Sequence, residues 1–95
     1  MDSRGTGSYA VHKDKIAYRV IEEEAVLLNV DKGVYYCLNK TGTAVWECLA
    51  QSKGVAEILK LLSRRFPDVP LKRLEKDLHE VLRDLEKEQL IYRKK

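Results

Sequence analysis

The chain has 95 residues, of which 44% are hydrophobic and 35% are charged, and its formal net charge is +3. This length supports one domain with a single modest core, and it leaves no room for a cleft between two domains. The mixed charge lacks the strong basic excess of a dedicated nucleic-acid binder. No segment has the roughly 20 consecutive apolar residues that cross a bilayer, so we expect a cytoplasmic protein without a membrane partner.

The first half of the chain predicts a polar tail followed by a small sheet. Residues 1–10 are rich in Gly and Ser and are expected to form a disordered N-terminal tail before a domain over residues 11–95. Apolar runs at Ile16–Ile21, Ala25–Val30 and Val34–Leu38 predict three strands. The breaks "EEE" and "DKG" are short enough for hairpins, so the strands should pair antiparallel with Val34–Leu38 at the edge.

The second half of the chain predicts three helices. After Asn39, a plausible N-cap, the apolar period changes from 2 to 3.6 and indicates a helix from about Lys40 to Ala50. A second apolar stripe from Val55 to Phe66 ends at Pro67. A third helix has an apolar arc about 100° wide, formed by Leu71, Leu74, Leu78, Val81, Leu82 and Leu85. The order β-β-β-α-α-α predicts an α+β fold, a winged helix-turn-helix with the wing first.

The residues that carry catalysis and metal binding are sparse in this chain. Cys37 and Cys48 are eleven positions apart, with no CxxC and no histidine spacing that indicates a metal site. His12 and His79 lie far apart in the sequence, and no general base can be placed near either cysteine from spacing. Without a Gly-rich phosphate loop as well, the chain is expected to be a non-enzyme that uses no cofactor.

The strand expected at the edge of the sheet is the most informative feature. An edge strand exposes unpaired N–H and C=O groups, and soluble proteins usually protect it with Lys, Pro or a bulge. Val34–Leu38 contains neither Lys nor Pro. Another segment of the chain could cover this edge, or an extended peptide could pair with it by strand addition, and the residues leave both open. Tyr35 and Tyr36 should point to opposite faces of the sheet.

Two alternative functions follow from the same pattern. The first is a winged-helix DNA-binding protein, since basic residues surround the turn before the third helix: Arg64, Arg65, Lys72 and Arg73. The third helix would then enter the groove of DNA, yet it carries about as many acids as bases, and the acids would repel phosphates. The second alternative is a homodimer in which two edge strands pair with each other.

The stretch "LLNVDKGVYYCLNKTGTAVWECL" closely resembles the signature of the PqqD-like family. The shared features are a hairpin turn ending in Gly, a Tyr-containing strand, Leu-Asn, a Thr-Gly pair and an apolar-Trp position. They fall here at Asp31, Gly33, Tyr35, Tyr36, Leu38, Asn39, Thr41, Gly42, Val45 and Trp46. "VAEILKLLSRRFP" and "LEKDLHEVLRDLEKEQLI" resemble the second and third helices of the family. One departure is Gln89, where the family commonly has Gly before the closing Leu-Ile.

This resemblance implies a non-catalytic peptide-binding module. PqqD-like domains, also called RiPP recognition elements, have the wing-first winged helix-turn-helix fold. They bind the leader segment of a ribosomally made precursor peptide and present its core to a modifying enzyme, such as a radical SAM maturase, a cyclase or a leader protease. The resemblance implies no cofactor.

The resemblance also implies where the leader binds. In the family, the leader adds as a strand to the third β-strand and lies in the groove between that strand and the third helix. Carried onto this sequence, the strand side of the groove is Val34, Tyr35, Tyr36, Cys37 and Leu38. The helix side is Leu74, Asp77, Leu78 and Val81.

Overall fold

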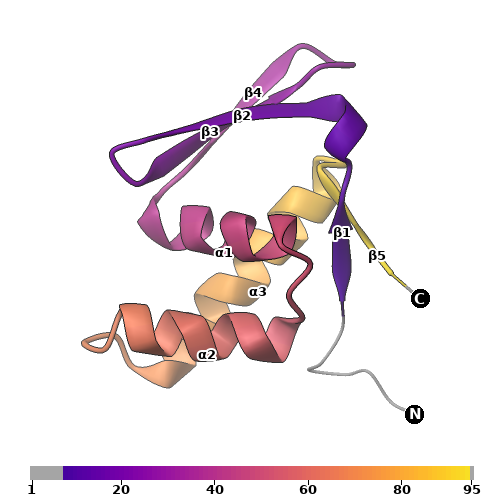
Figure 1. The fold of residues 1–95 in the computed structure, drawn as a ribbon. Helices are drawn as coiled ribbons and strands as arrows, with labels where there is room; N and C mark the ends of the chain where they lie inside the picture. Colours follow the sequence, from indigo (N-terminus) through magenta and orange to yellow (C-terminus); the bar gives the residue numbers. More distant parts are fainter. Residues whose placement is uncertain (1–7, 95) are drawn as a thin grey trace.

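The computed structural model describes residues 8–94 and confirms the predicted α+β fold, a three-stranded antiparallel sheet followed by three helices (Figure 1). A short two-stranded ribbon joins the two ends of the described chain. In chain order the elements are β1 (Tyr9–Val11), the 3₁₀ turn η1 (Lys13–Lys15), β2 (Ile16–Ile21), β3 (Glu24–Asn29), β4 (Val34–Leu38), α1 (Lys40–Ala50), α2 (Val55–Arg65), α3 (Leu71–Lys87) and β5 (Ile91–Arg93).

The larger sheet has the order β2-β3-β4, so β4 lies at its edge as predicted. In the central strand, Leu27 faces Tyr18 on β2 and Tyr36 on β4. The middle strand spans Glu24–Asn29, one residue earlier than the sequence pattern indicated. The loop before β4 ends at Gly33, whose φ of 68° is the left-handed value that the "DKG" turn predicted.

The N-terminal part of the domain begins earlier than expected. Residues 1–7 of the expected tail lie outside the described residues, but Tyr9 and Ala10 are not a tail, because they form β1 with Val11. This strand pairs antiparallel with β5, and the Tyr9 side chain is buried in the core. Composition alone could not indicate this, since the partner strand lies more than eighty residues later in the chain.

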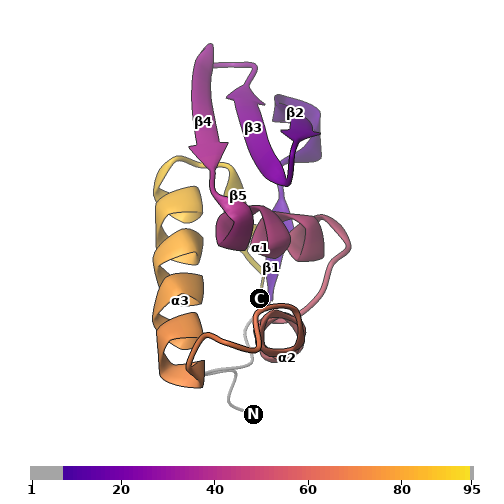
Figure 2. The same cartoon turned by 90° about the vertical axis from the view of Figure 1, so that its left-hand side faces the viewer.

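The core lies between the inner face of the sheet, the three helices and the start of β5. From β3 and β4 it receives Ala25, Leu27 and Leu38, which lie above α1 (Figure 2). The helices contribute a continuous set of buried apolar side chains: Val45, Trp46, Leu49, Ile58, Leu62, Leu74, Leu78, Leu82 and Leu85. Each fully buried side chain of this kind is worth on the order of 1.5–3 kcal/mol relative to exposure, so these contacts fix the arrangement of sheet and helices.

The junction between β4 and α1 is tight and has no linker. Asn39 caps the helix as predicted, because its side-chain Oδ1 accepts a hydrogen bond from the Gly42 N–H at 2.8 Å. A Cβ atom at Gly42 would lie 3.2 Å from Cδ2 of Leu38 and 3.3 Å from Oδ1 of Asn39. The absence of a side chain at Gly42 therefore lets the first turn of α1 approach the end of the edge strand.

Thr43 fastens the helix to the sheet through one buried hydroxyl. Its Oγ1 accepts a hydrogen bond from the N–H of Ala25 at 2.8 Å and donates to the carbonyl of Leu38 at 3.3 Å. Ala25 and Leu38 face each other across β3 and β4, so the hydroxyl bridges the two strands where they meet α1. Thr43 is only 2% exposed, and water has little access to replace these bonds.

We expect Thr43→Val to destabilise the fold by about 1–3 kcal/mol, because it leaves a buried N–H and a buried C=O without their partner. Thr43→Ser is the matched control, since it keeps the hydroxyl and loses only a methyl group, at about 1 kcal/mol. Urea unfolding of the two variants and the parent chain measures both costs. Equal stability of the Val and Ser variants would show that the hydroxyl bridge contributes nothing.

The C-terminus of α3 ends in a Schellman motif built on Gln89. The N–H of Gln89 donates a hydrogen bond to the carbonyl of Glu86 at 3.0 Å, and the N–H of Leu90 donates one to the carbonyl of Leu85 at 2.9 Å. The motif needs a left-handed residue, and Gln89 has a φ of 62°. Gln89 therefore occupies a position that favours glycine, which is the residue that the family resemblance predicted here.

Gln89→Gly should stabilise the chain by roughly 0.5–1 kcal/mol, because it removes the steric cost of a side chain at positive φ while the capping bonds remain. Glu88→Gly is the matched control one residue earlier, where φ is −82° and glycine brings only extra unfolded-state entropy. The denaturation midpoints should therefore move in opposite directions. A Gln89→Gly midpoint at or below that of the parent would contradict this account.

Candidate functional site

The outer edge of β4 carries a row of backbone groups without a ladder partner. The strand pairs with β3 on one side, and no other strand among residues 8–94 pairs with its second side. β1 pairs with β5 and not with this edge. In Figure 2, β4 stands at the end of the sheet directly above α3. The open edge and the helix thus form the two sides of one groove.

The two tyrosines of β4 point to opposite faces, as their adjacency predicted. Tyr36 faces α3 and is half-buried, and it lines the same cavity as Asp84. Tyr35 lies on the outer face of the sheet with 67% of its surface exposed. Tyr36 is therefore the tyrosine that lines the groove, and Tyr35 is not.

The groove contains a cavity of about 300 Å³ between β4, the start of α1 and α3. Such a volume accommodates one or two side chains rather than a drug-sized ligand. Its walls are mostly polar. The lining residues from β4 and α3 are Tyr36, Cys37, Leu38, Arg73, Asp77, Glu80, Val81 and Asp84.

The structure brings together only part of the site that the resemblance implied. Asp77 and Val81 line the cavity, but Leu74 and Leu78 are each 1% exposed and belong to the core. Leu78 faces α2, where it borders a separate cavity. These two leucines lie in the core because the apolar stripe of α3 packs inward, and the cavity is lined by the neighbouring arc of the helix.

Three groove residues were not identified from the sequence. Arg73, Glu80 and Asp84 lie on the same arc of α3 as Asp77, at spacings of four, three and seven positions from it. Side chains three, four and seven positions apart lie on the same side of a helix. Once Asp77 is placed in the groove, this spacing predicts that the three residues line it as well. Their charge alone does not indicate this position, because a charged residue on a helix is most often exposed to solvent.

Burial and the neighbouring acids of α3 both change the pKa of the Tyr36 phenol. Partial burial is the largest cause that raises the pKa of the Tyr36 phenol above its ordinary value of 10.0. The nearby carboxylates of Asp84 and Glu88 raise this pKa further. Because the folded-state pKa lies above that of the unfolded chain, the neutral phenol contributes stability below about pH 10 that is lost as pH rises further.

Asp84→Asn should lower the pKa of Tyr36, because it removes a negative charge beside the phenol. The pKa should stay above its ordinary value, since burial is the largest cause and remains. Ultraviolet titration of the phenolates measures the change, and Tyr36→Phe identifies which transition belongs to this residue. An unchanged transition in Asp84→Asn would show that the two side chains do not interact.

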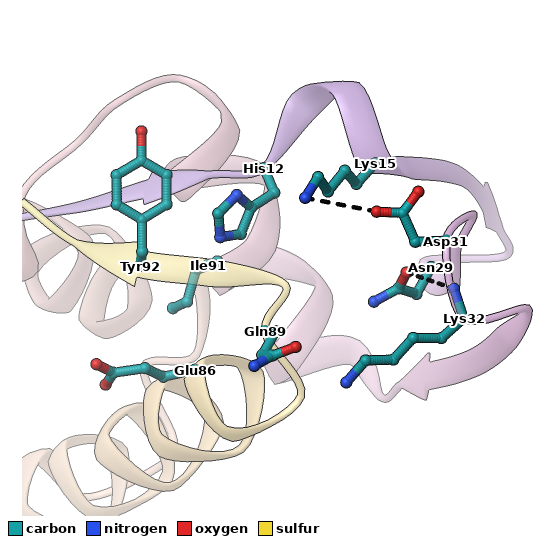
Figure 3. A pocket seen from close by; sticks show the side chains of 9 residues that line it. All are labelled: His12, Lys15, Asn29, Asp31, Lys32, Glu86, Gln89, Ile91 and Tyr92. Carbon is teal, nitrogen blue, oxygen red and sulfur yellow. Dashed lines mark hydrogen bonds and ion pairs between the residues drawn. The ribbon is translucent and has the colours of Figure 1, made fainter.

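A larger cavity, of about 410 Å³, lies under the β3–β4 turn beside η1 and the end of α3 (Figure 3). Most of its charged groups are already paired. Lys15 lies 3.4 Å from Asp31, and Glu86 lies 3.6 Å from Arg93. Asn29 holds the turn through its Oδ1, which accepts from the N–H of Lys32 at 3.1 Å. These contacts fix the hairpin, so we place the candidate site in the groove, where backbone groups remain open.

Residues 8–94 show no group of three or more His, Cys, Asp or Glu side chains arranged to hold a metal ion. Of the two cysteines, Cys37 is an exposed free thiol on β4. Cys48 is buried, and this burial is the main cause that raises the pKa of its thiol. Within the same residues, no helix has the length and apolar character needed to cross a membrane.

Comparison with known proteins defines the family. Residues 24–91 match the family described as Coenzyme PQQ synthesis protein D (PqqD), which is more than half of the chain. The chain belongs to the PqqD family. The match begins at β3 and ends at the first residue of β5, so it includes every element of the groove in this PqqD-family chain.

One solved structure resembles this PqqD-family chain closely. It is described as TbiB1 in complex with the TbiA(beta) leader peptide. The two share 28% sequence identity and a TM-score of 0.77, over 86% of this chain and 93% of that one. No curated protein matches the chain in sequence.

Proposed function

We propose that this chain is a RiPP recognition element, which binds the leader segment of a ribosomally made precursor peptide by strand addition to β4. The observation that carries the proposal is the open edge of β4 above the α3 groove. Membership of the PqqD family and the similarity to a protein solved with a leader peptide support it. In this function the chain is a binding module and does not catalyse a reaction.

Backbone pairing supplies most of the proposed binding. A leader that lies along Val34–Leu38 in extended form exchanges N–H···O=C bonds with the free edge, and these bonds tolerate different leader sequences. Alternate leader side chains then face α3, because side chains alternate across a strand. The cavity beside Tyr36 and Val81 accepts one or two of them, which gives specificity without a deep pocket.

The proposed outcome of binding is delivery of the core peptide to a modifying enzyme. A peptide held on the module and brought to its enzyme reacts at an effective concentration far above its concentration in free solution. The partner enzyme in this proposal is of the kind that such modules serve, a radical SAM maturase, a cyclase or a leader protease. No cofactor of the chain itself is needed for this role.

Titration of the isotope-labelled chain with the precursor peptide encoded beside its gene tests the site. Amide shifts should concentrate on Val34–Leu38 and on the arc of α3 from Asp77 to Asp84. The rate of Cys37 alkylation should fall on binding, since the added strand lies beside this exposed thiol, whereas the slow reaction of buried Cys48 should not change. Saturable binding with shifts confined to other surfaces would contradict the proposed site.

Leaders methylated on single backbone nitrogens provide the sharper control. In a strand pair, only alternate N–H groups of the peptide point toward the partner strand. Methylation should therefore weaken binding strongly at every second position and only slightly at the positions between them. An equal loss of affinity at every methylated position, or no loss at any position, would exclude strand addition even if the peptide binds in the groove.

A further inference from the structure

We propose that the groove selects leaders with a basic side chain, Lys or Arg, at a position that faces α3. This inference rests on the proposed function and specifies which leaders the site accepts. It follows from the distribution of charge along α3, from the absence of charge on β4, and from the geometry that strand addition imposes on the peptide.

The side of α3 that faces the groove is rich in acids, and most bases of the helix lie beside it. Four acids, at positions 77, 80, 84 and 88, lie within an arc of about 80° at 100° per residue. Three of them line the groove cavity, and Glu88 is close enough to act on Tyr36. Most bases of the helix lie on the adjoining arc: Lys72, Lys76, Arg83 and Lys87. The wall that faces the groove is therefore acidic, in a chain whose net charge is +3.

Little positive charge offsets these acids within the groove. Arg73 is the one base that lines the cavity, and it lies 3.7 Å from Asp77. β4 contributes none, because Val34–Leu38 contains no charged residue. Within residues 8–94, neither Glu80 nor Glu88 has an ion-pair partner at 4.0 Å or less. Asp84 has none among these residues either, so Asp77 is the one acid of the four that a base of the described residues pairs with.

The bound strand places a side chain where these acids can reach it. Its inward side chains lie on the same face of the extended sheet as Tyr36, which contacts Asp84 from β4. The position is partly shielded from water, since Tyr36 on the same face is itself partly buried. A Lys or Arg side chain that points inward is attracted by the negative carboxylates of α3, whereas an inward Asp or Glu side chain is repelled by them.

A display library of random 12-residue peptides, selected on the immobilised full chain, tests the inference and does not require the natural leader. Peptides that compete with each other and shift the β4 amides should be enriched in Lys and Arg at alternate positions and depleted in Asp and Glu. The double variant Glu80→Gln/Glu88→Gln should lose this enrichment. It retains Asp84, which lines the cavity together with Tyr36.

The control variant is Glu22→Gln/Glu75→Gln, which makes the same change in net charge at two exposed positions outside the groove. One selected peptide and its Lys→Gln counterpart are then titrated against all three proteins. We expect the lysine to strengthen binding to the parent and to the control about fivefold at low salt, and to have little effect in the groove variant. The advantage should shrink as salt shortens the Debye length from about 30 Å to about 8 Å.

The outcomes separate this inference from the proposed function. Peptides that bind the β4 edge without basic enrichment overturn the inference and leave strand addition intact. Equal loss of the lysine advantage in both variants also overturns it, because net charge rather than the groove would then be responsible. Failure to select any peptide that shifts the β4 amides overturns the proposed function and the inference together.

Discussion

The arrangement of the groove depends on the hydroxyl of Thr43. This group links the N–H of Ala25 and the carbonyl of Leu38 while it sits in the first turns of α1. It therefore fixes the sheet relative to the helix that follows β4 without a linker. Asn39 and Gly42 act in the same turn, through a cap and a close approach to Leu38. These contacts hold β4 on α1, and the buried apolar side chains between α1 and α3 place the third helix below the strand.

The helix beneath β4 carries out two tasks on neighbouring arcs. Its leucines fill the core, including Leu74 and Leu78, and so hold α3 against α1 and α2. The next arc faces the groove and carries acids around a single apolar residue, Val81. A single helix thus supports the fold and determines what the groove attracts. Substitutions on one arc can change binding with little effect on the core, because the two sets share few contacts.

Sequence reasoning predicted the fold more fully than the site. The strands and helices follow from strong periodicity, from Asn39 as a cap and from Gly33 as a left-handed turn residue, all of which are local signals. β1 was missed because its pairing with β5 depends on a distant partner. The helix side of the groove was predicted only in part, since residues such as Leu78 and Asp77 differ in orientation by a fraction of a turn. Only the packed structure shows which arc faces β4.

The acidic wall of α3 has a consequence for how two copies of the chain meet. An unprotected edge strand invites a second copy to pair with it and extend the sheet across both molecules. In such a symmetric pair, the same face of each sheet carries its α3, so the two rows of carboxylates would confront each other across the shared groove. Their mutual repulsion opposes self-pairing, although β4 itself has no charged residue to prevent it. The wall can thus keep the edge vacant in a concentrated solution of identical molecules while it leaves the edge open to a chain of opposite charge.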